Sequence, residues 1–254
     1  MYASGLGWLS RVKWLLARGA KIHLGTLMSG ATSFIYACMA GRLEVVRELC
    51  SKGASVNSTS ADSGTSALIE ASLYGHLEIV RELCVKGASV NFAKKGDGYT
   101  ALMCASQEGH VEVVRELCAR GANVNYARAS DGSTSLMTAS MQGHLEVVRE
   151  LCVKGANVNA TKTDNGSTAL MCASQEGYLE IVLELCTKGA NINAARTDNG
   201  TTALILASCS GHLEVVRLLL QKGADKSPID TYGETALSSA SGPQKSALQA
   251  LLKP

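Results

Sequence analysis

The sequence has few aromatic residues and little proline. Aromatic side chains make up 4% of its 254 residues, and there are three prolines. Hydrophobic residues still make up 46%, which is enough to bury a substantial core in one or two domains. We therefore expect a core built mainly from small and aliphatic side chains.

A long apolar segment and an excess of charge are also missing. No apolar run approaches the ~20 residues that a membrane-spanning helix needs, and the N-terminus lacks the order of a secretory signal. The net charge is +2, from 24 basic and 22 acidic residues, without the concentrated basic face that is typical of nucleic-acid binding. We expect no direct membrane insertion and no nucleic-acid partner.

Metal-binding and catalytic motifs are absent as well. The sequence has no CxxC or HExxH motif, and the histidines at 76, 110, 144 and 212 recur at a wide, regular spacing instead of clustering. The pattern does not bring a nucleophile, a base and an oxyanion donor together. We predict that the protein is not an enzyme and holds no cofactor or metal. Nine cysteines, an odd number without a secretory signal, predict reduced thiols in an intracellular, cytoplasmic setting.

What the sequence contains instead is an internal repeat of fixed period. Residues 100–109 and 168–177 both read TALMCASQEG. Because the two copies lie at equivalent places of a repeating array, two repeats apart, their cysteine and glutamate do not indicate a reactive site. The period is 34 residues. A run similar to LEVVRELC follows each of six glycines at this spacing: Gly41, Gly75, Gly109, Gly143, Gly177 and Gly211.

One period predicts two short helices and a finger, the name used here for the turn-rich segment that links one repeat to the next. Residues 100–108 form the first helix, which Thr100 caps, and residues 110–120 form the second, which Gly121 ends. Asp131-Gly132 predicts a tight turn in the finger. Such a unit cannot bury its apolar faces alone, whereas stacked neighbours can.

This unit resembles the ankyrin repeat. The resemblance rests on T-A-L at 100–102, A-S at 105–106, G-H at 109–110 and GANVN at 121–125. It implies an all-α ankyrin repeat solenoid of stacked helix-turn-helix units with β-hairpin-like fingers. It also implies a single domain over 1–254, with a partial N-terminal repeat (1–31), six full repeats (32–234) and a C-terminal capping repeat (235–254).

Two departures from the family pattern bear on how the repeats are held together. Most units are one residue longer than the family's usual unit. The family's histidine, which fastens finger backbones, is replaced by methionine or isoleucine, so we expect apolar contact to do more between repeats. The partial N-terminal repeat exposes Trp8 or Trp14, which predicts that it packs on a further repeat or on another chain.

The cysteines are expected to differ in accessibility. Those that end the LEVVRELC runs take the place of a buried leucine and are predicted to be core residues. We expect only Cys38 and Cys209, nearer the inner surface, to be reactive thiols.

The resemblance implies a protein-protein interaction module, part of a scaffold, adaptor or receptor, that binds a protein or peptide on its concave face. Variable positions on that face include the residues before each capping Thr or Ser, such as Thr65, Ser133, Ser167 and Thr201. Finger packing is an equal alternative for the aromatic residues at the finger bases, Phe92 and Tyr126. The predicted partner-binding residues are Met39, Leu73, Tyr74, Phe92, Tyr99, Gln107, Glu108, Tyr126, Met141, Gln142, Gln175 and Glu176.

The fingers carry a second column of candidate residues. Four basic residues recur at the period, each followed closely by an aspartate: Lys94, Arg128, Lys162 and Arg196. One interpretation is a solvated tip where opposite charges offset each other. The other is a basic column that binds an acidic peptide or an anionic ligand, which would suit an alternative function as a structural, elastic or ligand-sensing segment of a larger protein.

Overall fold

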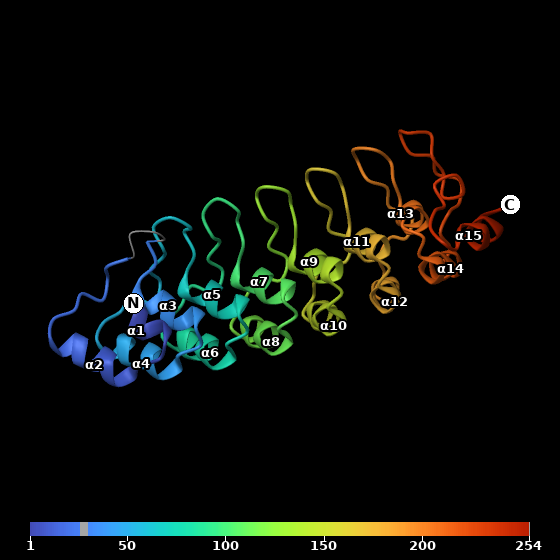
Figure 1. Ribbon diagram of the computed structural model, residues 1–254. Coiled ribbons are helices and arrows are strands. Elements are labelled where there is room, and N and C mark those ends of the chain that lie inside the picture. The colour runs from blue at the N-terminus through green and yellow to red at the C-terminus, as the bar shows by residue number, and fades with distance from the viewer. Residues whose placement is uncertain (26–29, 254) are drawn as a thin grey trace. The chain divides into compact units, whose positions relative to one another are not determined.

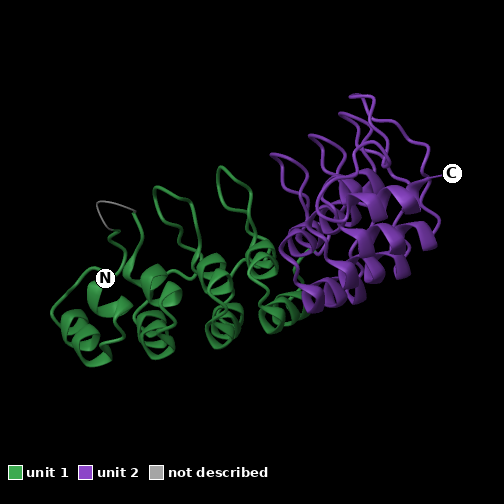
Figure 2. Ribbon diagram, turned by 45° about the vertical axis from the view of Figure 1, so that its right-hand side comes forward, with its two compact units in different colours: residues 1–123 green, residues 124–254 purple. Residues whose placement is uncertain are grey.

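The computed structural model describes residues 1–25 and 30–253 as helices joined by turns and fingers (Figure 1). Residues 26–29 of the predicted N-terminal repeat and Pro254 of the predicted capping repeat lie outside the described residues. The chain divides into two compact units, residues 1–123 and 124–254 (Figure 2), and each is described by itself. The prediction of a single domain stays a prediction.

Both units are built from pairs of helices, a first helix and a longer second helix, and unit 2 ends in one further helix that has no first helix before it. In unit 1 these are α1 (Tyr2–Gly5), α2 (Leu9–Ala17), α3 (Ser33–Met39), α4 (Leu43–Ser51), α5 (Ala67–Leu73), α6 (Leu77–Val85), α7 (Ala101–Gln107) and α8 (Val111–Ala119). In unit 2 they are α9 (Ser135–Gln142), α10 (Leu145–Val153), α11 (Ala169–Glu176), α12 (Leu179–Thr187), α13 (Ala203–Cys209), α14 (Leu213–Gln221) and α15 (Lys245–Leu252). Within each unit, first helices stack on first helices and second helices on second helices. The predicted all-α repeat architecture is confirmed.

The first helices begin where the sequence predicts. The side chain of Thr100 accepts a hydrogen bond from the backbone N–H of Met103 at 3.3 Å, which satisfies a donor that the helix leaves unpaired. The equivalent residue caps five other first helices in the same way: Thr32, Ser66, Thr134, Thr168 and Thr202. The repeated cap therefore fixes where each repeat starts.

The core lies between the two helix layers of each unit. In the fourth helix pair, Leu102 and Met103 of α7 and Val114 and Leu117 of α8 are all at most 2% exposed. Met103 stands where the family has histidine, and its burial agrees with the expected gain in apolar contact between repeats.

Polar contacts also join neighbouring repeats, which the sequence analysis did not predict. The ring Nε2 of His76 lies 3.0 Å from the backbone oxygen of Met39 in the preceding repeat, and His110 reaches Leu73 in the same way at 3.0 Å. The histidine that follows the repeat's glycine thus makes a backbone contact between repeats.

Backbone hydrogen bonds join adjacent fingers. In unit 2, the N–H of Thr163 donates to the backbone oxygen of Asp131 at 2.8 Å. Gly132 has a φ of +74°, and a Cβ added there would lie 2.6 Å from the nitrogen of Thr163. Glycine is required at this position for both reasons. In the described residues the fingers form only isolated β-bridges, such as Ala93 with Thr100.

The second helices carry charged side chains that link repeats on the solvated side. Arg81 pairs with Glu78 at 2.7 Å on its own helix and with Glu116 of the next repeat at 3.2 Å. Ion pairs within one helix are thus joined to ion pairs between repeats. In the part of the chain that the structure describes, no helix is both long enough and apolar enough to cross a bilayer.

Candidate partner-binding surface

The inner surface of unit 1, defined here as the C-terminal ends of α3, α5 and α7 with the adjoining end of α1, carries the predicted apolar residues. Met39 ends α3, and Leu73 ends α5; both are half-buried. Tyr74 directly follows α5, is 51% exposed and stacks on His76, with 6.3 Å between ring centroids. These three residues occupy equivalent or adjacent positions in neighbouring repeats, so the stacking brings them onto one surface.

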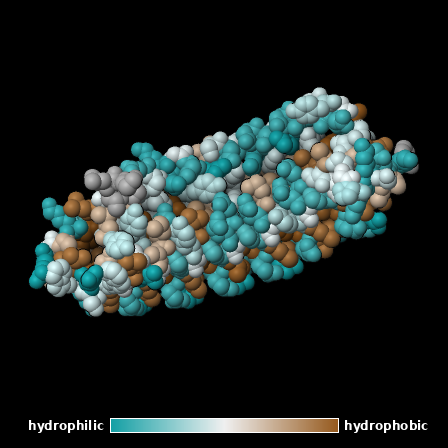
Figure 3. Space-filling model, viewed as in Figure 1, coloured by the Kyte–Doolittle hydropathy of each residue, from teal (hydrophilic) through white to brown (hydrophobic). Residues whose placement is uncertain are grey.

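An apolar groove of about 500 Å³ opens at the N-terminal end of this surface. It is lined by residues of α1 and α3 and those that follow them: Met1, Tyr2, Gly5, Leu6, Tyr36, Met39 and Ala40. Tyr2 is 78% exposed and Leu6 is 42% exposed. Hydrophobic residues are visible on the surface at this end of unit 1 (Figure 3).

The sequence analysis missed Tyr2, Leu6 and Tyr36 as surface residues of this groove. The signal was the repeat itself, because Tyr2 lies one full period before Tyr36 and Leu6 lies one full period before Ala40. Treating the first repeat as incomplete hid the equivalence. The exposure predicted for this repeat is present, since Trp8 is 43% and Trp14 is 53% exposed.

The other predicted residues of unit 1 lie farther along the same surface or on the fingers. Gln107 ends α7, and its side-chain amide donates to the exposed Glu108 at 2.9 Å. Tyr99 and Phe92 are half-buried on the finger side. Within unit 1, surface character therefore changes from apolar at α1 and α3 to polar at α7.

In unit 2 the equivalent positions are mostly polar. Met141 is 40% exposed, and Gln142, Gln175 and Glu176 are exposed as well. Tyr126 is half-buried at the start of its finger. Each of these residues lies where the repeat predicts, at the end of a first helix or at a finger base, but the aliphatic and aromatic cluster of unit 1 is not repeated.

The residues before the capping Thr or Ser do not belong to this surface. Thr65, Ser133, Ser167 and Thr201 are buried, between 5% and 8% exposed. The expectation that they vary as contact residues was wrong, because the chain at this point turns from the finger into the core-facing first helix. Tyr99 alone of this column is large enough to stay partly exposed.

The four basic finger residues are each paired with an aspartate. Lys94 donates to Asp97 at 2.8 Å, and this hydrogen bond raises the pKa of Lys94. Arg196 pairs with Asp198 at 2.9 Å. The charge of these two side chains is offset within their own finger, as in the solvated-tip interpretation.

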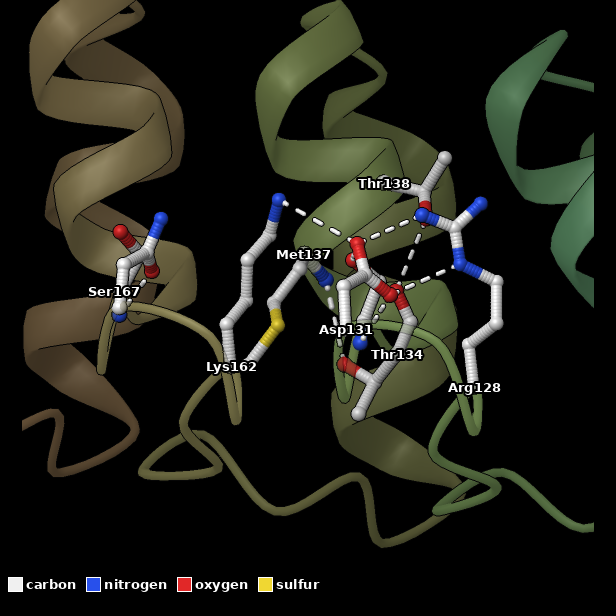
Figure 4. Close-up of polar contacts among 9 residues, drawn as sticks. Arg128, Asp131, Thr134, Met137, Thr138, Lys162 and Ser167 are labelled. Carbon is white, nitrogen blue, oxygen red and sulfur yellow. Dashed lines mark hydrogen bonds and ion pairs between the residues drawn. The ribbon is translucent and has the colours of Figure 1, made fainter. Parts of the chain in front are cut away.

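The remaining two basic residues share one carboxylate in unit 2 (Figure 4). Asp131 accepts hydrogen bonds from Arg128 Nε at 2.8 Å and Nη2 at 2.6 Å, and from the N–H and hydroxyl of Ser133. Lys162 Nζ lies 3.9 Å from the same carboxylate. The Arg128 hydrogen bonds, followed by those of Ser133, hold the pKa of Asp131 well below its ordinary value. This arrangement fixes the finger and neutralises Arg128, whereas Lys162 shares a carboxylate that Arg128 already occupies.

The cysteines correct one expectation. Cys38 is fully buried (0% exposed), and desolvation raises its pKa well above the ordinary thiol value. Cys38 aligns with the buried Ser72, whereas the exposed Cys209 aligns with Leu73, one residue later and so about 100° around the helix. The expectation of a reactive Cys38 was wrong. All nine cysteines are free.

Potential metal ligands do not gather among the described residues. Within them, no group of three histidine, cysteine or carboxylate side chains could hold a metal ion. The five cysteines that end the LEVVRELC runs are half-buried beside the core, not fully enclosed. The geometry is that of a stacked helical array with an apolar patch at one end of unit 1.

Comparison with known proteins identifies the class. A family model described as ankyrin repeats (3 copies) matches residues 1–94, 59–128, 125–196 and 193–254. The chain therefore belongs to the ankyrin repeat family. Ankyrin repeats are generally protein–protein interaction modules and typically serve as non-catalytic binding scaffolds.

A solved structure agrees in fold. The crystal structure of the human ASB11 ankyrin repeat domain is similar with a TM-score of 0.79 and 24% sequence identity, over 88% of this chain and 99% of that one. No curated protein matches the sequence.

Proposed function

We propose that this chain is a protein-interaction module that binds a protein or peptide partner on the inner surface of unit 1. The observation that carries the proposal is the apolar groove, continued by Met39, Leu73 and the exposed ring of Tyr74. Exposed aromatic and methionine side chains that lie together are the residues from which binding hot spots are built.

The mechanism is rigid presentation. Met39 and Tyr74 stand at the ends of α3 and α5, which are capped at their N-termini and packed between two neighbouring first helices, so these side chains lose little conformational entropy when a partner binds. Tyrosine adds a large apolar area and a hydroxyl that can form a hydrogen bond. Gln107 and Glu108 then form the polar rim on the α7 side, as interfaces commonly have around an apolar centre.

The proposal also includes the remaining predicted contact residues, although it does not depend on them. Tyr99 and Phe92 flank the inner surface on the finger side of unit 1. Met141, Gln142, Gln175 and Glu176 present the equivalent, more polar positions of unit 2 to a partner. We also propose that the protein works in a reducing intracellular compartment, which its nine free thiols support.

The proposal is tested by affinity capture with the full chain as bait, followed by mass spectrometry. Tyr74→Ala combined with Tyr99→Ala removes two rings on the first-helix and finger sides of the surface. The matched control is Val85→Ala, which truncates a 67% exposed side chain at the end of α6, on a second helix. Partners captured by the parent and by the control should be lost with the double variant; equal capture by all three would contradict the proposal.

A further inference from the structure

The first-helix segments of unit 1 carry acidic side chains and no basic side chain, although the N-terminal amine of Met1 lines the groove and the guanidinium of Arg42 donates to the backbone oxygen of Gly5 at 3.0 Å. The segments that contain the first helices and the residues around them, 2–6, 31–41, 65–75 and 99–109, include two ionisable acidic side chains, Glu70 and Glu108, and no lysine or arginine. This contrasts with the second helices, where glutamates alternate with arginines and form ion pairs with them. The carboxylates of Glu70 and Glu108 are therefore not paired with a basic side chain from the first helices themselves.

Glu70 lies in the first turn of α5 and is half-buried. It occupies the position of Tyr36 in the preceding repeat and of Cys104 in the next, and Tyr36 lines the apolar groove. The carboxylate of Glu70 is close enough to Cys38 and Cys104 to contribute to their raised pKa values, after the larger effect of burial. Glu70 therefore sits one repeat beyond the groove, in line with it.

No described residue forms an ion pair or hydrogen bond with the side chain of Glu70. Lys94 on the next finger interacts with it electrostatically, but the amine of Lys94 donates to Asp97 at 2.8 Å. A lysine or arginine brought by a partner could therefore form with Glu70 the charge-assisted hydrogen bond that no described residue provides.

Glu108 provides a second carboxylate farther along the same surface. It follows α7, is exposed, and accepts a hydrogen bond from the neutral amide of Gln107 at 2.9 Å. Tyr74, in the equivalent position one repeat earlier, lies between Glu108 and the groove. Apolar groove, exposed ring and carboxylates thus follow one another along the stack of first helices.

We propose that this surface selects a peptide segment of a protein partner in which a large apolar side chain enters the groove and lysine or arginine side chains reach Glu70 and Glu108. The proposal rests on the function proposed above and names the chemistry of the partner. Stacked helices lie ~10 Å apart and an extended chain advances ~3.3 Å per residue. The first cation is then expected about three residues from the apolar anchor and the second about six.

The test is selection of a phage-displayed library of random 16-residue peptides on the immobilised full chain. We expect enrichment of a large apolar residue followed or preceded at these spacings by lysine or arginine. The combined variant Glu70→Gln and Glu108→Gln should lose the basic preference and keep the apolar one. Glu70→Lys with Glu108→Lys should select acidic residues instead. Glu78→Gln, on the outer helix α6, is the matched control and should select the same peptides as the parent.

One selected peptide, synthesised with a fluorescent label, is then used to measure how much each variant changes the binding affinity. The Gln variant should weaken its binding about five- to tenfold, with a smaller dependence on salt than the parent. Thermal unfolding of each variant confirms that the fold is kept.

The outcomes separate the two proposals. Peptides that share an apolar anchor but no basic residue would overturn the partner chemistry while leaving the binding surface in place. Peptides whose binding is unchanged by Tyr36→Ala combined with Met39→Ala, or no enrichment at all, would overturn the binding surface itself.

Discussion

The side chain of Asn91 is bonded to the repeat that follows it, because its Nδ2 donates to the backbone oxygen of Gly121 at 3.1 Å. Its Oδ1 accepts from the N–H of Asn123 at 2.7 Å. The same two-way contact recurs at four other asparagines, each at the end of its repeat's GAxxN stretch: Asn57, Asn125, Asn159 and Asn193. A short side chain thereby fastens each of these repeats to the next through two hydrogen bonds.

Replacing Asn159 by alanine should destabilise the protein by about 1–2 kcal/mol, since two hydrogen bonds between repeats are lost, to Gly189 and to Asn191. The measurement is urea unfolding followed by circular dichroism. Asp164→Ala is the control, because that exposed finger carboxylate makes no hydrogen bond or ion pair with another described residue. A midpoint for Asn159→Ala equal to that of the control would show that the asparagine ladder does not stabilise the stack.

Replacing Asp131 by asparagine should cost about 1–3 kcal/mol at pH 7, because charge-assisted hydrogen bonds from Arg128 are lost from a mostly buried pair. The pKa of Asp131 is lowered in the folded protein. Its carboxylate therefore stabilises the fold fully above the unfolded pKa near 3.9, and this contribution declines as the pH falls below that value toward the lowered pKa.

The difference in unfolding free energy between the parent and Asp131→Asn should accordingly be constant from about pH 7 to pH 5 and shrink below about pH 4. Urea titrations at several pH values measure it. Asp198→Asn serves for comparison, because its carboxylate is 37% exposed and such a pair contributes only about 0–1 kcal/mol. A difference that grows on acidification would contradict the assigned direction.

Replacing Gly132 by alanine should be more damaging than replacing Gly155. Both glycines have a positive φ, but a Cβ at Gly132 would lie 2.6 Å from Thr163 N, whereas nothing lies within 4 Å of one at Gly155. Gly155→Ala should cost about 1 kcal/mol for the backbone conformation alone, and Gly132→Ala should cost about 1–3 kcal/mol more for the clash between fingers. Thermal or urea unfolding measures the loss of stability in each variant. Equal losses would mean that the neighbouring finger moves aside for the added Cβ at no cost, which would contradict the prediction.

Alkylation by iodoacetamide at pH 8 should modify Cys209 long before Cys38 or Cys104. Cys209 is exposed, whereas burial encloses the other two thiols and raises the pKa of Cys104 to about 12. Because the thiolate is the reacting form, the rates should differ by about a hundredfold or more. Peptide mass spectrometry gives the rate at each site, and all nine thiols should react alike in denaturant. Labelling of native Cys38 as fast as Cys209 would contradict its burial.

Much of the fold could be predicted because the same capping residues, glycines and apolar pattern recur in each repeat. Thr100 precedes an apolar helix and Gly121 follows the next one, and each signal returns at the period, so helix starts and ends were predictable from short-range physics. The positions of Leu102 and Leu117 in the core follow from helical periodicity in the same way.

The candidate surface was less predictable, because it depends on which side of a helix a residue faces after stacking. Met39 and Tyr74 were identified from the repeat, but Tyr2 and Leu6 acquired a role only when α1 packed beside α3 to form the groove. Cys38 and Cys209 looked equivalent in the sequence, yet a shift of one residue put one in the core and the other on the surface.

The sequence by itself determined that this is a stack of two-helix repeats, since capping, helix length and apolar periodicity act within a few residues of each other. Only the tertiary structure decided which charges are neutralised and which remain available. Lys162, 31 residues later, reaches the same Asp131 carboxylate that pairs with Arg128, whereas Glu70 remains without an ion-pair partner among the described residues, and neither fact can be read from the order of the letters. The reason is that pairing depends on distances set by the packing of successive repeats, over separations along the chain at which local preferences no longer act.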